Sequence, residues 1–139
     1  MPAIALMLSL CSVGHAQQFE DFGAFEVHYS TINTQQLSES IARNFDIERR
    51  DNRAMLNVSV IDTYTDEVVK ADITVTARNL LGQPRELQFD ELQRDGVYYY
   101  IGQFRIYNEE VLRFFLTVKP EDHAGRPFEF QFSQQFYSP

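Results

Sequence analysis

Apolar and polar residues alternate along most of this chain with a period of two residues. Between residues 53 and 62, Leu56, Val58 and Val60 fall on one side of an extended backbone, and the residues between them are polar. A period of two is typical of a β-strand with one buried face. The pattern predicts strands over residues 24–33, 53–62, 71–78, 86–90, 97–104, 111–118 and 128–136.

About seven strands at fairly even spacing favour a β-sandwich or a small barrel over a mixed fold. One interruption is helical, because Ser38 is placed to cap a short helix near residues 38–45, with Ile41 and Phe45 on one face. No repeat, linker or low-complexity tract divides the chain. The prediction is therefore an all-β, antiparallel domain with one short helix.

The beginning of the chain predicts an export signal. Residues 1–16 carry no charged side chain and include an apolar run from Ala3 to Cys11, which is too short to cross a bilayer. Gly14 and Ala16 supply the small residues that precede a signal-peptidase cut. We predict a signal peptide over residues 1–16, a single domain over residues 17–139 and periplasmic localisation, although the leader lacks the usual basic start.

Composition and charge narrow the range of partners. The formal net charge is −8, which disfavours nucleic acid and anionic membranes, because both are recognised largely through Lys and Arg. The single cysteine, Cys11, lies in the leader, so the mature chain has no disulfide. Twelve Phe and seven Tyr, with no Trp, make the chain rich in aromatic residues that suit a strand core.

Four blocks of sequence carry a resemblance to a known family. They are FGAFEVHY (residues 22–29), NRAMLNVSV (52–60), NLLGQ (79–83) and FSQQFY (132–137). Together they resemble the domain of unknown function 4426 family, proteobacterial proteins of about this size made with a signal peptide. The resemblance implies an immunoglobulin-like β-sandwich in the periplasm. It implies no activity and supplies no catalytic residues.

Glu26, His28 and Arg53 form the one cluster that could carry chemistry. Glu26 and His28 are two residues apart and share a strand face, so they could act as an acid/base pair or as metal ligands. Arg53 carries a planar guanidinium that suits a carboxylate or phosphate ligand. The alternative for Arg53 is a structural ion pair, for example with Glu109 or Glu110.

A metal site needs at least three converging ligands, and His123 is the only other histidine after the leader. The acidic turn at residues 62–67 could hold calcium weakly, but solvated acidic turns are more common. Motifs for serine or metal hydrolases and for phosphate loops are absent from the sequence. We therefore predict no metal, no cofactor and no catalytic residue.

Tyr98 and Tyr100 face one side of a predicted strand, and Tyr99 and Ile101 face the other. In the first interpretation one face is core and the other is partly covered. In the second, Tyr98 and Tyr100 form an exposed platform that binds a glycan, a peptide or a partner strand.

These observations predict a soluble periplasmic β-sandwich that binds or scaffolds a protein or an envelope component and does not catalyse. The first alternative is a periplasmic hydrolase or metal-dependent enzyme that uses Glu26, His28 and Arg53. The second is a small outer-membrane β-barrel, which the strand number and length disfavour. The sequence predicts no membrane-spanning segment and leaves the oligomeric state undefined.

Overall fold

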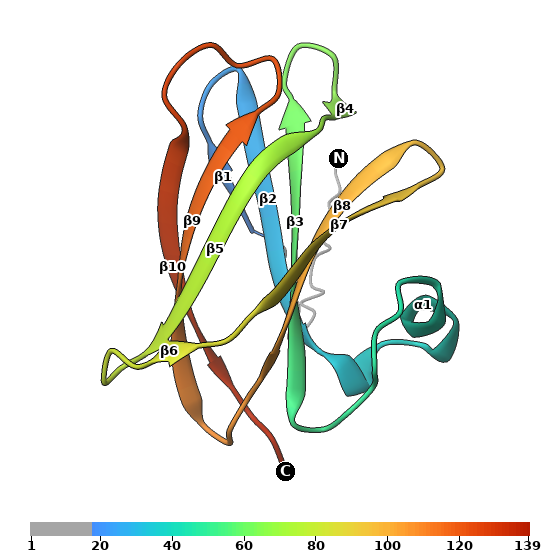
Figure 1. Cartoon of the computed structure of the whole chain (residues 1–139), viewed down its shortest axis with the longest axis vertical. Helices are drawn as coiled ribbons and strands as arrows, with labels where there is room; N and C mark the ends of the chain where they lie inside the picture. Colours follow the sequence, from blue (N-terminus) through green and yellow to red (C-terminus); the bar gives the residue numbers. More distant parts are fainter. Residues whose placement is uncertain (1–17) are drawn as a thin grey trace, which may run out of the picture.

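The computed structural model describes residues 18–139 and contains two antiparallel sheets (Figure 1). Sheet A has the order β1-β2-β3-β8-β7, with β4 paired to β3, and sheet B has the order β10-β9-β5-β6. The strands of sheet A are β1 (Gln18–Asp21), β2 (Phe25–Asn33), β3 (Arg53–Asp62), β4 (Glu67–Val68), β7 (Gln88–Arg94) and β8 (Val97–Arg105). Those of sheet B are β5 (Ala71–Asn79), β6 (Pro84–Arg85), β9 (Glu110–Pro120) and β10 (Phe128–Phe136).

All seven predicted strands are present, and the all-β sandwich prediction is confirmed. Three short strands, β1, β4 and β6, were not predicted. With four residues in β1 and two in each of the others, none is long enough to display a clear alternation. Within residues 18–139 the strands form two separate sheets.

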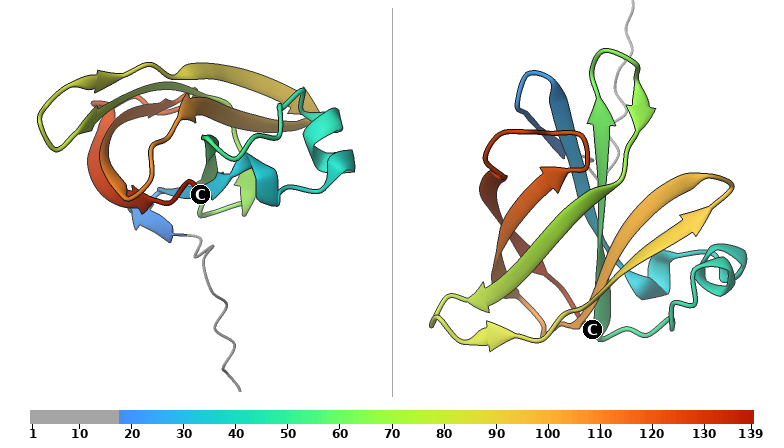
Figure 2. Two further views of the ribbon diagram at one scale, coloured as in Figure 1. Left: turned by 90° about the horizontal axis from the view of Figure 1, so that it is seen from below. Right: turned by 45° about the horizontal axis from the view of Figure 1, so that its top comes forward.

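The main core lies between the facing sides of the two sheets, as the alternation predicts (Figure 2). Leu56, Val58 and Val60 of β3 are fully buried there, and Phe114 and Leu116 of β9 reach the same core from sheet B. Burying apolar surface on both facing layers is the main force that holds the sandwich together.

A second, smaller core covers the outer face of sheet A. Its buried members are Ala42, Ile47, Met55 and Ile101, and the helix α1 (Glu39–Asn44) supplies the first of them. The helix begins as predicted, because the Ser38 Oγ accepts a hydrogen bond of 3.2 Å from the backbone N–H of Ile41.

The predicted apolar face of this helix is wrong in one respect. Phe45 packs edge-on against Tyr99, with ring centroids 5.1 Å apart, whereas the Ile41 side chain is 48% exposed. A helix of six residues is too short to bury both positions against the sheet. The predicted leader, residues 1–16, lies outside the described residues. No helix within residues 18–139 is long and apolar enough to span a membrane.

Candidate functional site

Glu26 and His28 meet on the outer face of sheet A. Glu26 Oε1 lies 3.0 Å from His28 Nε2, and both side chains are partly buried. The ring of Phe19, on the neighbouring strand β1, stacks on the imidazole with centroids 5.1 Å apart. The predicted pair therefore exists, but an aromatic side chain that offers no ligand atom covers one side of the imidazole.

Arg53 lies far from this pair. His28 is opposite Ser59 on β3, and Arg53 begins that strand six residues earlier, which is about 20 Å along an extended chain. His123 lies after β9 and packs against Phe25, a core residue on the other face of sheet A. The alternative cluster of Glu26, His28 and Arg53 is thus dispersed. Within residues 18–139, no group of three or more His, Cys, Asp or Glu residues could hold a metal ion.

The predicted ion pair between Arg53 and Glu110 is also wrong. Glu110 is occupied by Arg85, whose Nη1 and Nη2 donate to the two carboxylate oxygens at 2.8 and 2.7 Å. Both side chains are largely buried, with exposed fractions of 13% and 18%. Both Glu110 oxygens thus pair with Arg85, and within residues 18–139 no ion pair joins Arg53 to Glu109 or Glu110.

Tyr100 belongs to the core, so it cannot form the predicted exposed platform with Tyr98. Its side chain is 2% exposed, and its hydroxyl oxygen accepts a hydrogen bond of 2.8 Å from the backbone N–H of Ala71. Burial raises the pKa of Tyr100 to about 12. Tyr98 and Tyr100 do share one face, as predicted, but that face points into the core between the two sheets.

Tyr98 is partly buried at the margin of the same core. The Lys70 ammonium lies 5.5 Å from the Tyr98 ring centroid, and it also makes an ion pair of 3.1 Å with Glu91. The core and the Lys70 ammonium thus already contact the Tyr98 ring, and no external ligand is needed to explain its position.

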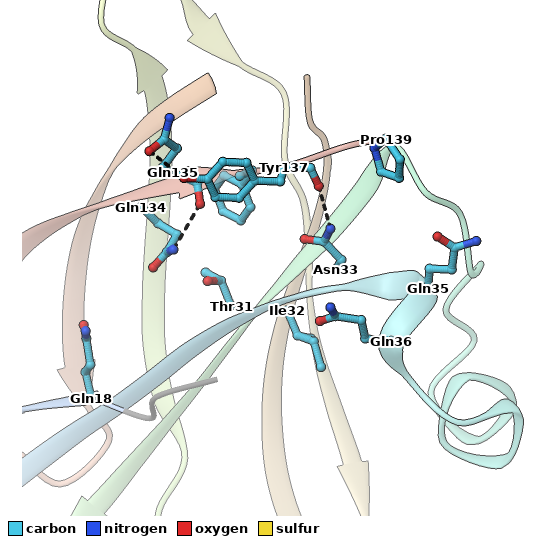
Figure 3. A pocket seen from close by; sticks show the side chains of 11 residues that line it. Gln18, Thr31, Ile32, Asn33, Gln35, Gln36, Gln134, Gln135, Tyr137 and Pro139 are labelled. Carbon is cyan, nitrogen blue, oxygen red and sulfur yellow. Dashed lines mark hydrogen bonds between the residues drawn. The ribbon is translucent and has the colours of Figure 1, made fainter. Parts of the chain in front are cut away.

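A groove of about 550 Å³ lies elsewhere, between the C-terminal ends of β2 and β10 (Figure 3). We call it the amide groove, because six of its lining side chains are Asn or Gln and none is Asp, Glu, Lys or Arg. The amides are Gln18, Asn33, Gln35, Gln36, Gln134 and Gln135, and the remaining lining residues are Thr31, Ile32, Phe136, Tyr137 and Pro139.

Two segments distant in sequence build most of the amide groove, and Gln18 of β1 completes its lining. After β2, the chain turns through the short 3-10 helix η1 (Thr34–Gln36), which presents Gln35 and Gln36. The fully buried Thr34 fixes this turn, because its Oγ1 accepts a hydrogen bond of 2.9 Å from the backbone N–H of Arg50. Across the groove, Asn33 Nδ2 donates to the Tyr137 carbonyl oxygen at 2.9 Å and ties the two walls together (Figure 3).

Tyr137 is the aromatic component of the amide groove. Its side chain is 57% exposed, and its hydroxyl donates to Gln135 Oε1 at 2.9 Å. An exposed ring surrounded by amides can stack on an apolar ligand face while the amides donate and accept hydrogen bonds. The groove contains no nucleophile with an adjacent base among its lining residues.

The sequence analysis missed the amide groove. The signal available was the pair of Gln-Gln dipeptides at residues 35–36 and 134–135, separated by about a hundred residues. Strand periodicity does not reveal that the ends of β2 and β10 meet, because that contact depends on how the two sheets stack.

Solved structures share the fold of this chain. A crystal structure of a DUF4426 family protein from Pseudomonas aeruginosa matches with a TM-score of 0.76 and 25% sequence identity, over 88% of this chain and 96% of that one. A copper-bound variant of FetP from uropathogenic Escherichia coli matches with a TM-score of 0.63 and 9% identity, over 90% and 97% of the two chains.

A second FetP structure, of the protein as isolated after expression in the periplasm, has a TM-score of 0.62 and 9% identity, over 90% and 96% of the two chains. At this identity the FetP structures bear on the fold alone. None of the curated proteins matches the sequence. The predicted resemblance is confirmed by the family model described as Domain of unknown function (DUF4426), which matches residues 19–139, and the chain therefore belongs to the DUF4426 family.

Proposed function

We propose that this protein is an exported, non-catalytic binding module and that the amide groove holds a neutral saccharide chain of the cell envelope. The observation that carries the proposal is the chemistry of the groove, in which six amides and an exposed tyrosine line about 550 Å³ without a charged side chain. This neutrality stands out in a chain with 23% charged residues and a net charge of −8.

Sugar hydroxyls both donate and accept hydrogen bonds, and so do the Asn and Gln amides of the groove. The 57% exposed ring of Tyr137 offers a flat surface on which the C–H face of a sugar ring can stack. A charged ligand would lose hydration on entering and would find no opposite charge among the lining side chains. These three features favour a neutral, hydroxyl-rich ligand.

A peptide strand is the other ligand class that the surroundings allow. Strand β10 is an edge of sheet B, and edge strands offer unpaired backbone groups to a partner. The groove, however, is lined by side-chain amides around the C-terminal end of β10, whereas strand addition would engage the length of that edge. The groove chemistry therefore favours the saccharide, and strand addition is an outcome that the experiment can reveal.

An enzymatic role has little geometric support. General acid/base catalysis needs titratable groups within hydrogen-bond reach of one substrate, and Arg53 lies about 20 Å along β3 from the Glu26–His28 pair. Copper is bound by the FetP variant, which is similar to this chain in fold alone. Glu26 and His28 supply two donors, whereas a metal site needs three or more.

Export to the periplasm is part of the proposal, and it rests on the apolar leader of residues 1–16. Cell fractionation of the full-length chain, followed by N-terminal sequencing, is expected to give a periplasmic product that begins at Gln17. A cytoplasmic product that retains the leader would refute this part of the proposal.

The binding proposal is tested by calorimetric titration of the mature protein with maltotriose, cellotriose and chitotriose, and with the anionic trimer of galacturonic acid. At least one neutral trisaccharide is expected to bind, and the anionic trimer is expected to bind more weakly. Tyr137→Ser should weaken binding about tenfold, a typical cost of losing a stacked aromatic contact.

Tyr64→Ser is the matched control, because Tyr64 is 87% exposed in the turn before β4 and lines no part of the amide groove. Its binding should equal that of the wild type. Equal losses for the two variants, or no binding of any neutral trisaccharide, would refute the saccharide assignment.

A further inference from the structure

We propose that a second hollow, at the opposite edge of β3 from β2, binds the carboxylate group of a small organic acid between Arg53 and Arg105. The hollow has a volume of about 370 Å³ and is lined by residues from the C-terminal end of β8 and the start of β3. Figure 1 shows these two strand ends side by side. It shares no lining residue with the amide groove, so the carboxylate proposal and the saccharide proposal can be tested independently.

Arg53 and Arg105 lie directly opposite each other in the pairing of β3 with β8. Like charges at directly opposed positions destabilise a sheet unless something neutralises them. Within residues 18–139, neither guanidinium makes an ion pair with an acidic side chain. Two cations without an ion-pair partner at the edge of a hollow are an arrangement that an anion would stabilise.

The Arg53 side chain carries a further sign of a missing partner. Its Nε atom is buried and makes no hydrogen bond to any group in the described part of the chain. A buried donor without an acceptor costs about 1–3 kcal/mol, so natural proteins rarely leave one unpaired. A carboxylate in the hollow would supply the acceptor that this N–H lacks.

The other lining groups suit an oxyanion. Gln88 and Gln103 lie opposite each other in the pairing of β7 with β8, and their amides can donate to a carboxylate. The half-exposed ring of Tyr107 lies 5.0 Å from the Arg105 guanidinium carbon and 5.1 Å from that of Arg85, so it helps to hold both cations beside the hollow.

The charge balance favours a singly charged ligand. Arg85 also lines the hollow, but Glu110 already neutralises it through two hydrogen bonds. Glu86 contributes one negative charge to the lining and offsets one of the two remaining arginines. One net positive charge is left, which matches a carboxylate better than a doubly charged phosphate.

Sheet B contains a comparison for this site. Arg78 and Arg113 are also directly opposed, in the pairing of β5 with β9, but both are exposed and neither lines a hollow. In the pair at the hollow Arg105 is exposed too, whereas Arg53 is half-buried and carries the unpaired Nε. If anions were attracted to any opposed pair of arginines, benzoate would bind at both pairs. If the hollow is a specific site, benzoate binds only at Arg53 and Arg105.

The experiment is an NMR titration of the mature protein, observed at the arginine side-chain Nε–H groups. The probes are sodium benzoate and, separately, inorganic phosphate, and sodium chloride keeps the ionic strength constant. Benzoate is expected to shift the Arg53 Nε–H signal in a saturable manner and to bind more tightly than phosphate.

Arg53→Gln should weaken benzoate binding by about tenfold or more, as expected for the loss of a charged hydrogen-bond donor, and Arg78→Gln should leave binding unchanged. An Arg53 signal that benzoate does not move, equal effects of the two variants, or tighter binding of phosphate would overturn the proposal. The wild-type titration decides the matter even if Arg53→Gln does not fold.

Discussion

The Tyr100 hydroxyl remains in the core because it is hydrogen-bonded, not because it reaches water. Its oxygen accepts from the backbone N–H of Ala71 at 2.8 Å, which links β8 of sheet A to the first residue of β5 in sheet B. The sequence pattern placed Tyr100 on the same face as Tyr98, but only the structure reveals that this face is buried and that the opposite sheet supplies a donor. A tyrosine that the sequence offers as a binding surface thus joins the two layers.

This burial predicts a dependence of stability on alkaline pH. In the unfolded chain Tyr100 ionises near its ordinary pKa of 10.0, whereas in the folded protein its pKa is about 12. Above pH 10 the unfolded state binds fewer protons than the folded state, so the free energy of unfolding should fall as the pH rises through this window. Denaturant unfolding at a series of pH values measures this slope.

The Tyr100→Phe variant should lose part of that alkaline slope. At neutral pH it should unfold with a free energy about 2 kcal/mol lower, because the buried Ala71 N–H loses its acceptor. Tyr64→Phe is the control, since Tyr64 is 87% exposed and should leave both quantities unchanged. If Tyr100→Phe retained the full slope and stability, the hydroxyl would have no such role.

At the scale of elements, the ion pair of Arg85 and Glu110 fastens the short strand β6 to the start of β9. Both guanidinium Nη atoms donate to the carboxylate, and Arg85 Nη1 also donates to the Arg105 carbonyl oxygen at 2.8 Å. A strand of two residues has few ladder bonds of its own, so this pair is expected to hold β6 in place.

Arg85→Met should therefore lower the free energy of unfolding by about 3 kcal/mol, because it leaves a largely buried carboxylate without a partner. The double variant Arg85→Met/Glu110→Met should recover much of that loss, since no unpaired charge remains. Urea unfolding of the two single variants and the double variant completes the cycle. Additive losses would mean that the pair is not energetically coupled.

Elements differ in how well the sequence predicts them, and the difference follows length. The long strands β3, β9 and β10 repeat the alternation several times, so their position and inward faces could be predicted. The short β4 and β6 form only because longer neighbours present free backbone groups to them. Their existence is a tertiary effect that no local pattern records.

At the scale of the whole molecule, the predictions fail where the two sheets meet. The pattern identified Tyr98 and Tyr100 as facing one way, but it could not tell that sheet B covers that face. It also suggested that Glu26, His28 and Arg53 form one site. Along β3, however, Arg53 lies about 20 Å from Ser59, the residue opposite His28. The stacking of the sheets decides which side chains converge. The alternation of apolar and polar residues along the chain does not record how the sheets stack.

The amide groove and the arginine hollow arise from the same stacking. The groove needs the end of β10 beside the end of β2, and the hollow needs the segment after β6 beside the end of β8. One has no charged side chain and the other is basic, within a chain of net charge −8. The fold thus presents two small surfaces of different chemistry.

The most direct test of the central claim is an NMR titration of the mature protein with the neutral trisaccharides, observed at the side-chain amide groups of Asn and Gln. The account predicts saturable shifts at Asn33, Gln36 and Gln134, and weaker binding by Gln36→Glu, which adds a charge to the groove. Gln131→Glu, on the exposed side of β10 outside the groove, should bind like the wild type. Unmoved groove amides, or equal weakening by the two variants, would contradict the claim that the amide groove binds a neutral saccharide.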